Sequence, residues 1–477
     1  MDVMELTLGE VAKALGSSVA MPERVARGYT IDSRTLAEGD LFFAIRGPRF
    51  DGHEFVPQTL ERGGIGAVVT LEHYNSSPDS LRSLLIPVAD TTRALQQLGQ
   101  SVRKRWGKPL VAVTGSAGKS TTKEMAAAIL GRRMKVLKSK GNLNNHLGVP
   151  LTLLALEPEH DVAVAELAMS GAGEIALLTR LAAPNIGVVT NVAAVHLEFF
   201  DSVDSIARAK QELIENLPPG AKAVLNFDDP RVRGFAAGFG GQVVTFGLGE
   251  GADVRAVDLR ADASRGCRFR LQSAPLEGEI HVPLPGRHNV QNALAAIAAS
   301  HLLGASVEDA RDAMEIFQPL ALRSEILTLA SGVVLISDCY NSNPLAMERM
   351  LETLARWPGA RRRIVVAGEM LELGSGSPNM HLAVGRICPE NGVDWLIAVQ
   401  GDAKLLVEGA VLAGLPAGRT RFFATPEEVG EFCGAMLEPG DVVLVKGSRG
   451  VHLEKVVDFL RAASPDSKGA PSPPSRR

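Results

Sequence analysis

The stretch from Val111 to Thr122 holds the side chains best suited to phosphate chemistry. It reads V-A-V-T-G-S-A-G-K-S-T-T, an apolar run that enters a glycine-rich turn and then a segment able to form a helix. In such a turn, backbone N–H groups point at phosphate oxygens, Lys119 neutralises the β- and γ-phosphates, and the Ser120 hydroxyl holds Mg²⁺. The general pattern G-x-x-x-x-G-K-[ST] asks for glycine where this chain has Val113, so the match is partial. The predicted phosphate-binding residues are Gly115, Ser116, Ala117, Gly118, Lys119, Ser120 and Thr121.

Two further side chains follow apolar runs and could hold a metal. Glu166 ends the run 162–165, and His196 comes shortly after the run 186–189. Because the carboxyl ends of parallel strands open into the ligand crevice, both are candidate Mg²⁺ ligands. The alternatives are a surface or helix-capping glutamate and a structural histidine.

Lys210 lies on the apolar side of a predicted helix. The segment 201–217 reads as a helix with Asp201 or Ser202 as N-cap, and Lys210 completes the stripe of Ile206, Leu213 and Leu217. An inward lysine has a lowered pKa, and its neutral amine can react with CO₂ to give a carbamate, a possible Mg²⁺ ligand. The alternative is a lysine that extends to solvent along the helix edge.

The composition excludes several classes of protein. The net charge of −4 and the absence of a dense basic run argue against nucleic-acid binding. The four cysteines are far apart without C-x-x-C pairing, which favours reduced thiols in a cytoplasmic protein. The N-terminus is acidic, unlike a signal peptide, and no apolar run approaches the roughly 20 residues of a membrane helix.

The predicted strands and helices that must position these residues indicate an α/β protein. Its 477 residues are enough for about three domains. The predicted units are a small α/β domain (1–88), a helical connector (89–106), a central domain (107–320), a C-terminal domain (321–462) and a disordered tail (463–477). Apolar strands that alternate with helices predict a parallel, mononucleotide-binding sheet in the centre, and a Rossmann-like doubly wound sheet at the C-terminal side. Residues 252–284 alternate polar and apolar, as in an antiparallel hairpin. The predicted strands are 41–45, 67–69, 84–88, 110–113, 162–165, 186–189, 223–225, 243–246, 333–336, 364–367, 395–399, 421–424 and 442–445, and the predicted helices include 6–15, 91–106, 121–130 and 289–303.

Together, these residues resemble the Mur ligase family from about residue 28 to about residue 456. The family's loop is T-G-[ST]-x-G-K-[ST], so Val113 is normal for it. The resemblance implies that Glu166 and His196 bind Mg²⁺ and that Lys210 is carbamylated, with two metal ions at the site.

Four stretches resemble the branch of the family that adds a dipeptide. They are D-S-R with L-F-F-A-I-R-G and D-G-H (32–34, 41–47, 51–53), G-N-L-N-N-H-L-G-V-P (141–150), D-C-Y-N-S-N-P (338–344), and G-E-M-L-E-L-G with V-K-G-S-R (368–374, 445–449). The departures are Glu369 for aspartate, Ala168 for glycine and Ser342 for alanine. None of them removes a proposed ligand.

The resemblance implies an ATP-dependent ligase that joins D-alanyl-D-alanine to UDP-N-acetylmuramoyl-tripeptide through an acyl phosphate. P-G-R-H-N-V-Q-N (285–292) would bind adenine through Asn289 and Asn292, Arg323 would reach the phosphates, and Asp338 would lie near the ribose. An interdomain salt bridge is the alternative for Arg323 and Asp338. The first domain would bind the uridine nucleotide, and the third would swing over ATP to close the site. The implied substrate-binding residues are Ser33, Arg34, Asp51, His53, Asn144, Asn145, Tyr340, Asn341 and Lys446.

Three other functions stay open at this point. One is a family member that adds a single amino acid, although the D-N-P-[RA] stretch of such ligases is not visible. Another is a folate-polyglutamating ligase, which lacks a uridine-binding domain like residues 28–55. The third is a nucleotide-dependent switch that ligates nothing.

For the ligase we expect a cytoplasmic monomer whose partners are small-molecule substrates, with no nucleic acid and no membrane span.

Overall fold

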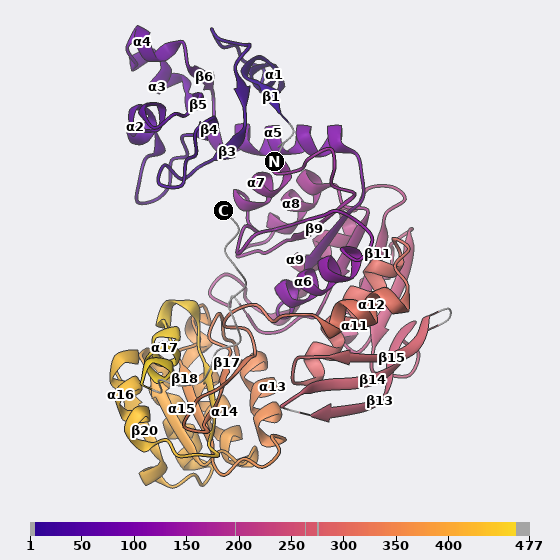
Figure 1. The fold of residues 1–477 in the computed structure, drawn as a ribbon, viewed down its shortest axis with the longest axis vertical. Coiled ribbons are helices and arrows are strands. Elements are labelled where there is room, and N and C mark those ends of the chain that lie inside the picture. Colours follow the sequence, from indigo (N-terminus) through magenta and orange to yellow (C-terminus); the bar gives the residue numbers. More distant parts are fainter. Residues whose placement is uncertain (1–4, 196, 263, 274–275, 464–477) are drawn as a thin grey trace.

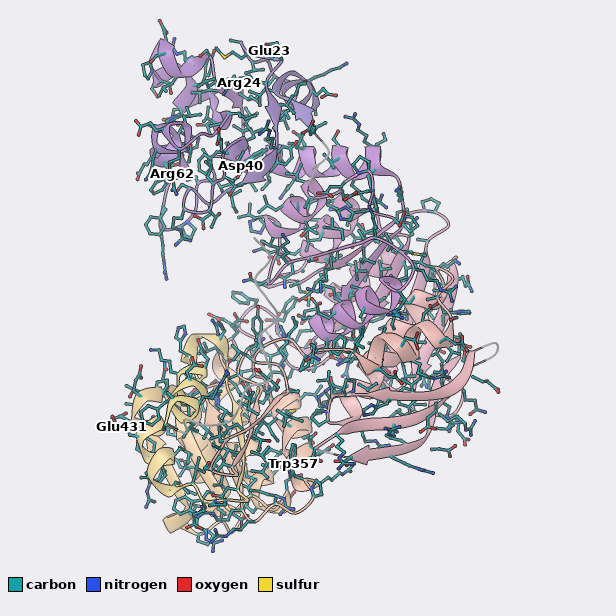
Figure 2. The ribbon with its side chains drawn as sticks, in the orientation of Figure 1. Glu23, Arg24, Asp40, Arg62, Trp357 and Glu431 are labelled. Carbon is teal, nitrogen blue, oxygen red and sulfur yellow. The ribbon has the colours of Figure 1, made fainter. Side chains whose placement is uncertain are left out.

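The computed structural model describes residues 5–195, 197–262, 264–273 and 276–463. Figure 1 shows three α/β bodies in chain order, with the central one between the other two. The predicted α/β class with three domains is confirmed. Figure 2 places Glu431, on α16 (Pro426–Met436), on the outer side of the C-terminal body, away from the central one. No helix in the described part of the chain is long and apolar enough to span a membrane.

The N-terminal body is built on a four-stranded parallel sheet. Its strand order is β3-β4-β5-β6. The predicted strands 41–45, 67–69 and 84–88 are confirmed as β4, β5 and β6, whereas the short strand β3 was not predicted. Thr7 caps the first helix through a capping box. The elements are β1 (Leu6–Thr7), α1 (Leu8–Ala14), β2 (Val25–Ala26), β3 (Gly28–Thr30), β4 (Asp40–Phe43), α2 (Val56–Glu61), β5 (Gly66–Thr70), α3 (Leu71–Ser76), α4 (Asp79–Arg82) and β6 (Leu85–Val88).

Helix α5 (Thr91–Trp106) joins the first two bodies, as predicted. Asp90 caps its N-terminus, and Gly107 ends it in the left-handed region. Leu95, Leu98 and Val102 on its buried face belong to one apolar cluster with residues of the N-terminal sheet and of α7 (Gly148–Leu154). The two bodies therefore share a core along this helix.

The central body is a nine-stranded sheet in the order β15-β14-β13-β12-β11-β10-β7-β9-β8. The strands from β8 to β13 run parallel, and β13 to β15 form an antiparallel meander. The prediction of a hairpin over 252–284 was wrong in one respect, because three strands occupy it. Alternation of polar and apolar residues gives the strand period but not the number of chain reversals. The strands are β7 (Leu110–Thr114), β8 (Val136–Lys138), β9 (Val162–Glu166), β10 (Ile186–Val189), β11 (Lys222–Asn226), β12 (Gln242–Gly247), β13 (Val254–Asp262), β14 (Gly266–Ser273) and β15 (Leu276–Val282).

Helices cover both faces of the parallel part. Val111 and Val113 of β7 point into a cluster with α6 and α11, whereas Leu110 and Ala112 point into the cluster that contains α5 and α7. This alternation is why the strand is apolar throughout. The remaining helices are α6 (Lys119–Leu130), α8 (Glu174–Ala182), α9 (Val203–Glu215), α10 (Pro230–Gly234), α11 (Arg287–His301) and α12 (Val307–Glu315).

The C-terminal body has a six-stranded sheet in the order β16-β17-β21-β18-β19-β20, parallel except for β16. Helices α13, α14 and α15 cover one face, and α16 and α17 cover the other. The predicted doubly wound sheet is confirmed, and β16 is an addition. The elements are β16 (Glu325–Thr328), β17 (Val334–Ser337), α13 (Pro344–Ala355), β18 (Arg363–Gly368), α14 (Ser377–Glu390), β19 (Trp395–Val399), α15 (Lys404–Leu412), β20 (Thr420–Phe423), β21 (Val442–Lys446) and α17 (Glu454–Ala462), with residues 464–477 of the predicted tail outside the described part.

Candidate active site

The glycine-rich turn connects β7 to α6, as the sequence predicts. Gly115 and Gly118 have φ of +146° and +83°, and Gly118 is the N-cap of α6. Asn191 holds the turn from the end of β10: its Oδ1 accepts from Ala117 N (2.9 Å) and its Nδ2 donates to Ala117 O (2.9 Å). The Thr190 hydroxyl also donates to Ala117 O, at 2.6 Å. Together with the bond from Ser116 N to Asn191 O (2.9 Å), these contacts fix the shape of the loop before a phosphate arrives.

Gly118→Ala should weaken nucleotide binding about tenfold or more, because a displaced loop loses a hydrogen bond to a phosphate. A hydrogen bond to a charged group contributes about that much to binding. A Cβ at Gly118 would lie 2.2 Å from Asn292 Oδ1, so either the loop or Asn292 must move. Titration of ADP by calorimetry measures the loss. The matched control is Gly173→Ala, because Gly173 is also a helix N-cap (φ +85°) but has open space around a Cβ. Equal ADP affinity for the two variants would contradict the prediction.

Lys119, Ser120 and Glu166 converge at the N-terminus of α6. Lys119 Nζ donates to Gly115 O (2.8 Å), and burial lowers the pKa of this lysine. Ser120 Oγ donates to Glu166 Oε2 at 2.6 Å, and Asn144 Nδ2 donates to Glu166 Oε1 at 2.9 Å. Glu166 is 3% exposed. A hydroxyl and a buried carboxylate beside a phosphate loop are the oxygen donors that Mg²⁺ takes in addition to nucleotide phosphates and water.

No cluster of three or more His, Cys, Asp or Glu side chains that could hold a metal occurs among the described residues. A magnesium ion with one or two protein ligands does not need such a cluster. His196 lies outside the described residues, so its predicted role stays a prediction.

Lys210 faces inward from α9, as the periodicity of the helix predicts. Ser202 caps this helix, and Lys210 is 2% exposed beside buried Ile206 and Leu213. Burial, and then the positive charge of Lys119, hold the pKa of Lys210 well below its usual range. No carboxylate among the described residues forms an ion pair with it. The amine therefore has the environment that favours its neutral, nucleophilic form.

Asn289 and Asn292 lie buried on the first turns of α11. Asn289 Nδ2 donates to Pro285 O (2.8 Å), and Asn292 Nδ2 donates to Asn289 Oδ1 (3.1 Å). Because Asn292 packs against Gly118, this pair continues the surface of the phosphate loop. A ligand held by the loop can reach both asparagines.

The C-terminal body supplies the facing wall. The guanidinium of Arg323 stacks on Tyr340, 4.1 Å from the ring centre. Lys446 Nζ donates to Asp338 Oδ2 (2.6 Å) and to Asn341 O (3.0 Å). Asp338 is thus paired inside its own domain, and it forms no interdomain ion pair with any residue that the structure describes.

The two walls enclose one cavity of about 440 Å³, here called the interdomain cavity. It brings together six of the seven predicted loop residues, the predicted metal ligand Glu166 and the predicted residues of the C-terminal domain, whereas Gly115 and Lys210 do not line it. Its chemically active lining is Ser116, Ala117, Gly118, Lys119, Ser120, Thr121, Asn144, Glu166, Asn289, Asn292, Arg323, Asp338, Tyr340, Asn341 and Lys446.

A second cavity, of about 820 Å³, lies between the N-terminal and central bodies and is called the N-terminal pocket. It is lined by Ser33 and Arg34 as predicted, and also by aromatic and basic side chains. The further lining residues include Tyr29, Phe42, Phe50, Phe55, Lys138 and Lys140.

Three predicted substrate-binding residues have contacts inside the protein instead. Asp51 accepts from Arg46 and pairs with His53 Nδ1 at 2.6 Å, and His53 Nε2 accepts from Thr70 N at 3.0 Å. The side chain of Asn145 accepts from Gly148 N and so starts α7. These residues shape the loops around the two cavities and do not line either of them.

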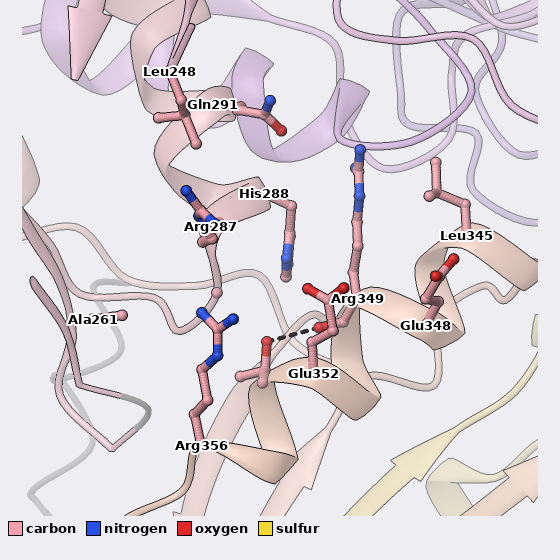
Figure 3. Close-up of a pocket in the computed structure, with 12 residues that line it drawn as sticks. Leu248, Ala261, Arg287, His288, Gln291, Leu345, Glu348, Arg349, Glu352 and Arg356 are labelled. Atoms are coloured by element: carbon pink, nitrogen blue, oxygen red, sulfur yellow. Dashed lines mark hydrogen bonds between the residues drawn. The ribbon is translucent and has the colours of Figure 1, made fainter. Parts of the chain in front are cut away.

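Other residues of the site were not predicted. Asn191 could have been found, because it follows the strand next to β7 in a predicted parallel sheet. The others come from the loop between β8 and α7, from α11, from α13 and from the C-terminal loops, and only folding brings them to the cavity (Figure 3 shows His288 of α11 and Arg349 of α13). They include His288, Asn142, Ser324, Arg349, Leu371, Ser448 and Arg449.

Comparison with known proteins gives a consistent result. Three family models match: "Mur ligase family, catalytic domain" at residues 26–103, "Mur ligase middle domain" at 113–300, and "Mur ligase, glutamate ligase domain" at 322–449. The UDP-N-acetylmuramoyl-tripeptide--D-alanyl-D-alanine ligase of Bacillus subtilis is 32% identical over 96% of this chain and 99% of its own length. The ligase of the same name from Escherichia coli is 34% identical over 96% and 99%.

Solved structures agree with this comparison. A crystal structure of MurF from Acinetobacter baumannii is 32% identical, with a TM-score of 0.88, and covers 97% of this chain and 100% of its own. MurF ligase from Thermotoga maritima in complex with ADP is 27% identical, with a TM-score of 0.80, over 92% and 98%.

Proposed function

This chain belongs to the Mur ligase family and is an ATP-dependent ligase, and we propose that it joins D-alanyl-D-alanine to UDP-N-acetylmuramoyl-tripeptide. The product is the UDP-muramoyl-pentapeptide precursor of peptidoglycan. The observation that carries the proposal is the interdomain cavity. A phosphate loop with a buried carboxylate on one wall faces a cationic wall from the domain that must deliver the amine.

The chain's own residues would bring two anions together. The substrate carboxylate attacks the γ-phosphoryl group of ATP, so an acyl phosphate forms and ADP leaves. The amine of D-alanyl-D-alanine then displaces phosphate. Lys119 and Arg323 line this cavity and would neutralise the charge of the phosphates, which otherwise opposes the attack.

Ser120 and Glu166 fit a magnesium ion at the phosphate loop. Bound there, Mg²⁺ would neutralise the β- and γ-phosphates. Asn144 orients Glu166 through the hydrogen bond to its second oxygen. We also propose a second ion held by His196 and a carbamate on Lys210. For Lys210, the buried amine with a lowered pKa supports this proposal.

The N-terminal pocket is proposed to take the uridine nucleotide. Its aromatic side chains suit the flat base, whereas Lys138 and Lys140 suit the diphosphate. This assigns substrate binding to residues 1–88, nucleotide chemistry to 107–320 and delivery of the dipeptide to 321–462, with 89–106 as the connector. Closure of the third domain over ATP would exclude water, which otherwise hydrolyses the acyl phosphate.

We further propose that the protein works in the cytoplasm as a monomer. All four cysteines are free and buried, which suits a reducing compartment. Size-exclusion chromatography with light scattering would test the monomer.

Phosphate release should depend on both peptide substrates. With ATP, Mg²⁺ and UDP-muramoyl-tripeptide, added D-alanyl-D-alanine is expected to raise steady phosphate release about 100-fold or more, because the acyl phosphate turns over only when the amine attacks it. A tripeptide ending in meso-diaminopimelate and one ending in lysine are both tested. Release that does not change with the dipeptide would favour a nucleotide switch and refute the proposal. Stimulation by a single amino acid instead would favour another ligase of the family.

A further inference from the structure

Glu124 is a buried carboxylate on α6, the helix that begins at the phosphate loop. It stands four residues after Ser120, so the two side chains lie on the same face of the helix, one turn apart. Its two oxygens contact two different lysines. Oε1 pairs with Lys123 Nζ at 3.1 Å, and Oε2 pairs with Nζ of Lys138, the last residue of β8. One carboxylate therefore connects α6 to the end of β8.

The two lysines have different surroundings. Lys123 is 1% exposed, and its Nζ also donates to Ser139 O at 2.7 Å. A buried ammonium group needs its counter-charge, so Glu124 Oε1 is committed to Lys123. The side chain of Lys138 is half exposed and lines the N-terminal pocket. Two cations thus share one anion in this group, here called the Glu124 cluster (Lys123, Glu124 and Lys138), and its unbalanced positive charge lies beside the pocket.

Ser139 joins the Glu124 cluster to the candidate metal site. Its hydroxyl accepts from Glu166 N at 3.0 Å, and its carbonyl accepts from Lys123. Glu166 in turn accepts from Ser120 Oγ on α6. These contacts close a ring that starts and ends on α6. A shift of either the end of β8 or the start of α6 would therefore disturb the other.

Lys140 provides an internal comparison for Lys138. Both lysines are exposed and line the N-terminal pocket, two residues apart in the chain. With the residues that the structure describes, Lys140 Nζ forms neither an ion pair nor a hydrogen bond, whereas Lys138 Nζ is tied to Glu124. An anion in the pocket can attract both ammonium groups, but only Lys138 connects it to α6.

We propose that the Glu124 cluster couples binding of the uridine nucleotide in the N-terminal pocket to binding of ATP at the phosphate loop, with Glu124 as a positioning residue. This rests on the proposed function. A diphosphate that binds Lys138 orders its half-exposed side chain, and through Glu124 this restrains α6 close to the phosphate loop. Part of the ordering that ATP binding requires is then complete, so each substrate raises the affinity for the other.

The test is calorimetric titration of ADP with Mg²⁺ into the full-length protein, with and without saturating UDP-muramoyl-tripeptide. ADP has no γ-phosphoryl group to transfer, so only binding is measured. In the wild type, UDP-muramoyl-tripeptide should raise ADP affinity about fivefold or more, the usual range for coupled sites. Titration of UDP-muramoyl-tripeptide with and without ADP should give the same coupling factor, because coupling is reciprocal. A purely structural role of Glu124 predicts no such factor.

Lys138→Met should lower the coupling factor to about twofold or less, because the connection to α6 is lost. Lys140→Met is the matched control: it also removes one charge from the pocket and weakens binding of UDP-muramoyl-tripeptide, but it should keep the coupling factor of the wild type. Glu124→Gln leaves Lys138 in the pocket and should also lose the coupling. It deprives buried Lys123 of its counter-charge, so a double variant with Lys123→Met and Glu124→Gln replaces it if it fails to fold.

An absent coupling factor in the wild type, or an unchanged one in Lys138→Met, would overturn the inference. An equal loss of coupling in Lys140→Met would do the same, because the factor would then report the charge of the pocket and not the contact with α6. None of these outcomes bears on the dependence of phosphate release on D-alanyl-D-alanine, which tests the proposed function separately.

Discussion

Lys210→Ala is expected to lower kcat about 1,000-fold, because it removes both the proposed carbamate and the magnesium ion held by it. Formate or acetate should restore part of the activity, since a small carboxylate can enter the space left by the lysine stem. Steady-state phosphate release with saturating substrates, with and without up to molar carboxylate, measures both effects. An unaffected Lys210→Ala enzyme would remove the carbamate hypothesis.

Lys210→Met separates the carbamate from the packing of α9. Methionine fills the apolar stripe between Ile206 and Leu213, so this variant should be as inactive as the alanine one but should not respond to carboxylates. Its thermal stability should equal or exceed that of the wild type, because a buried amine is replaced by an apolar group. Rescue of Lys210→Met by acetate would show that the carboxylate acts elsewhere.

The modification can also be observed without activity. Protein equilibrated with ¹³C-bicarbonate should show one slow-exchanging carbamate signal in the ¹³C spectrum that is absent from Lys210→Met. Burial lowers the pKa of Lys210, so more of the reactive neutral amine exists near neutral pH than for an exposed lysine. As pH falls, the amine binds a proton and the signal should decline. A signal that is identical in the variant would assign the carbamate to another amine.

Lys119→Met should lower kcat/KM for ATP about 1,000-fold or more, because the charge that Lys119 places on the β- and γ-phosphates is lost where two anions must meet. In the structure, its ammonium group donates to Gly115 O and so rests inside the loop, ready to exchange this carbonyl for phosphate oxygens. Phosphate release over a range of ATP concentrations measures the loss. The fold should persist, because no ion pair of the described residues depends on this lysine.

The control for Lys119 is Lys135→Met. Lys135 pairs with Glu159 on the surface of the same domain, 3.0 Å apart, and a surface pair of this kind contributes about 1 kcal/mol or less. Its removal should leave kcat/KM for ATP within about twofold. A loss in Lys119→Met that is no larger than in Lys135→Met would reject the role of Lys119.

Local sequence patterns predicted those features of the site that each depend on one short segment of the chain. The phosphate loop follows from the order of apolar run, glycines and lysine, and the inward side chain of Lys210 follows from the 3.6-residue period of its helix. Glu166 follows from the end of a continuous apolar strand. Each of these features depends on neighbours within a few residues, so the chain shows them before it folds.

The tertiary structure decided which side chains from distant segments contact these residues or line the same cavity. Asn191, which follows strand β10, forms hydrogen bonds to the phosphate loop. Asp338 forms an ion pair with Lys446, more than 100 residues away in the sequence. Arg349 lines the interdomain cavity from α13. The short strands β3 and β8 likewise exist only through pairing with longer neighbours. Sequence by itself thus determined the fold class and the phosphate loop, whereas the roles of the candidate metal ligands stay predictions. The partners and the second wall of the cavity were decided by packing between segments far apart in the chain, because local periodicity carries no information about which surfaces will touch.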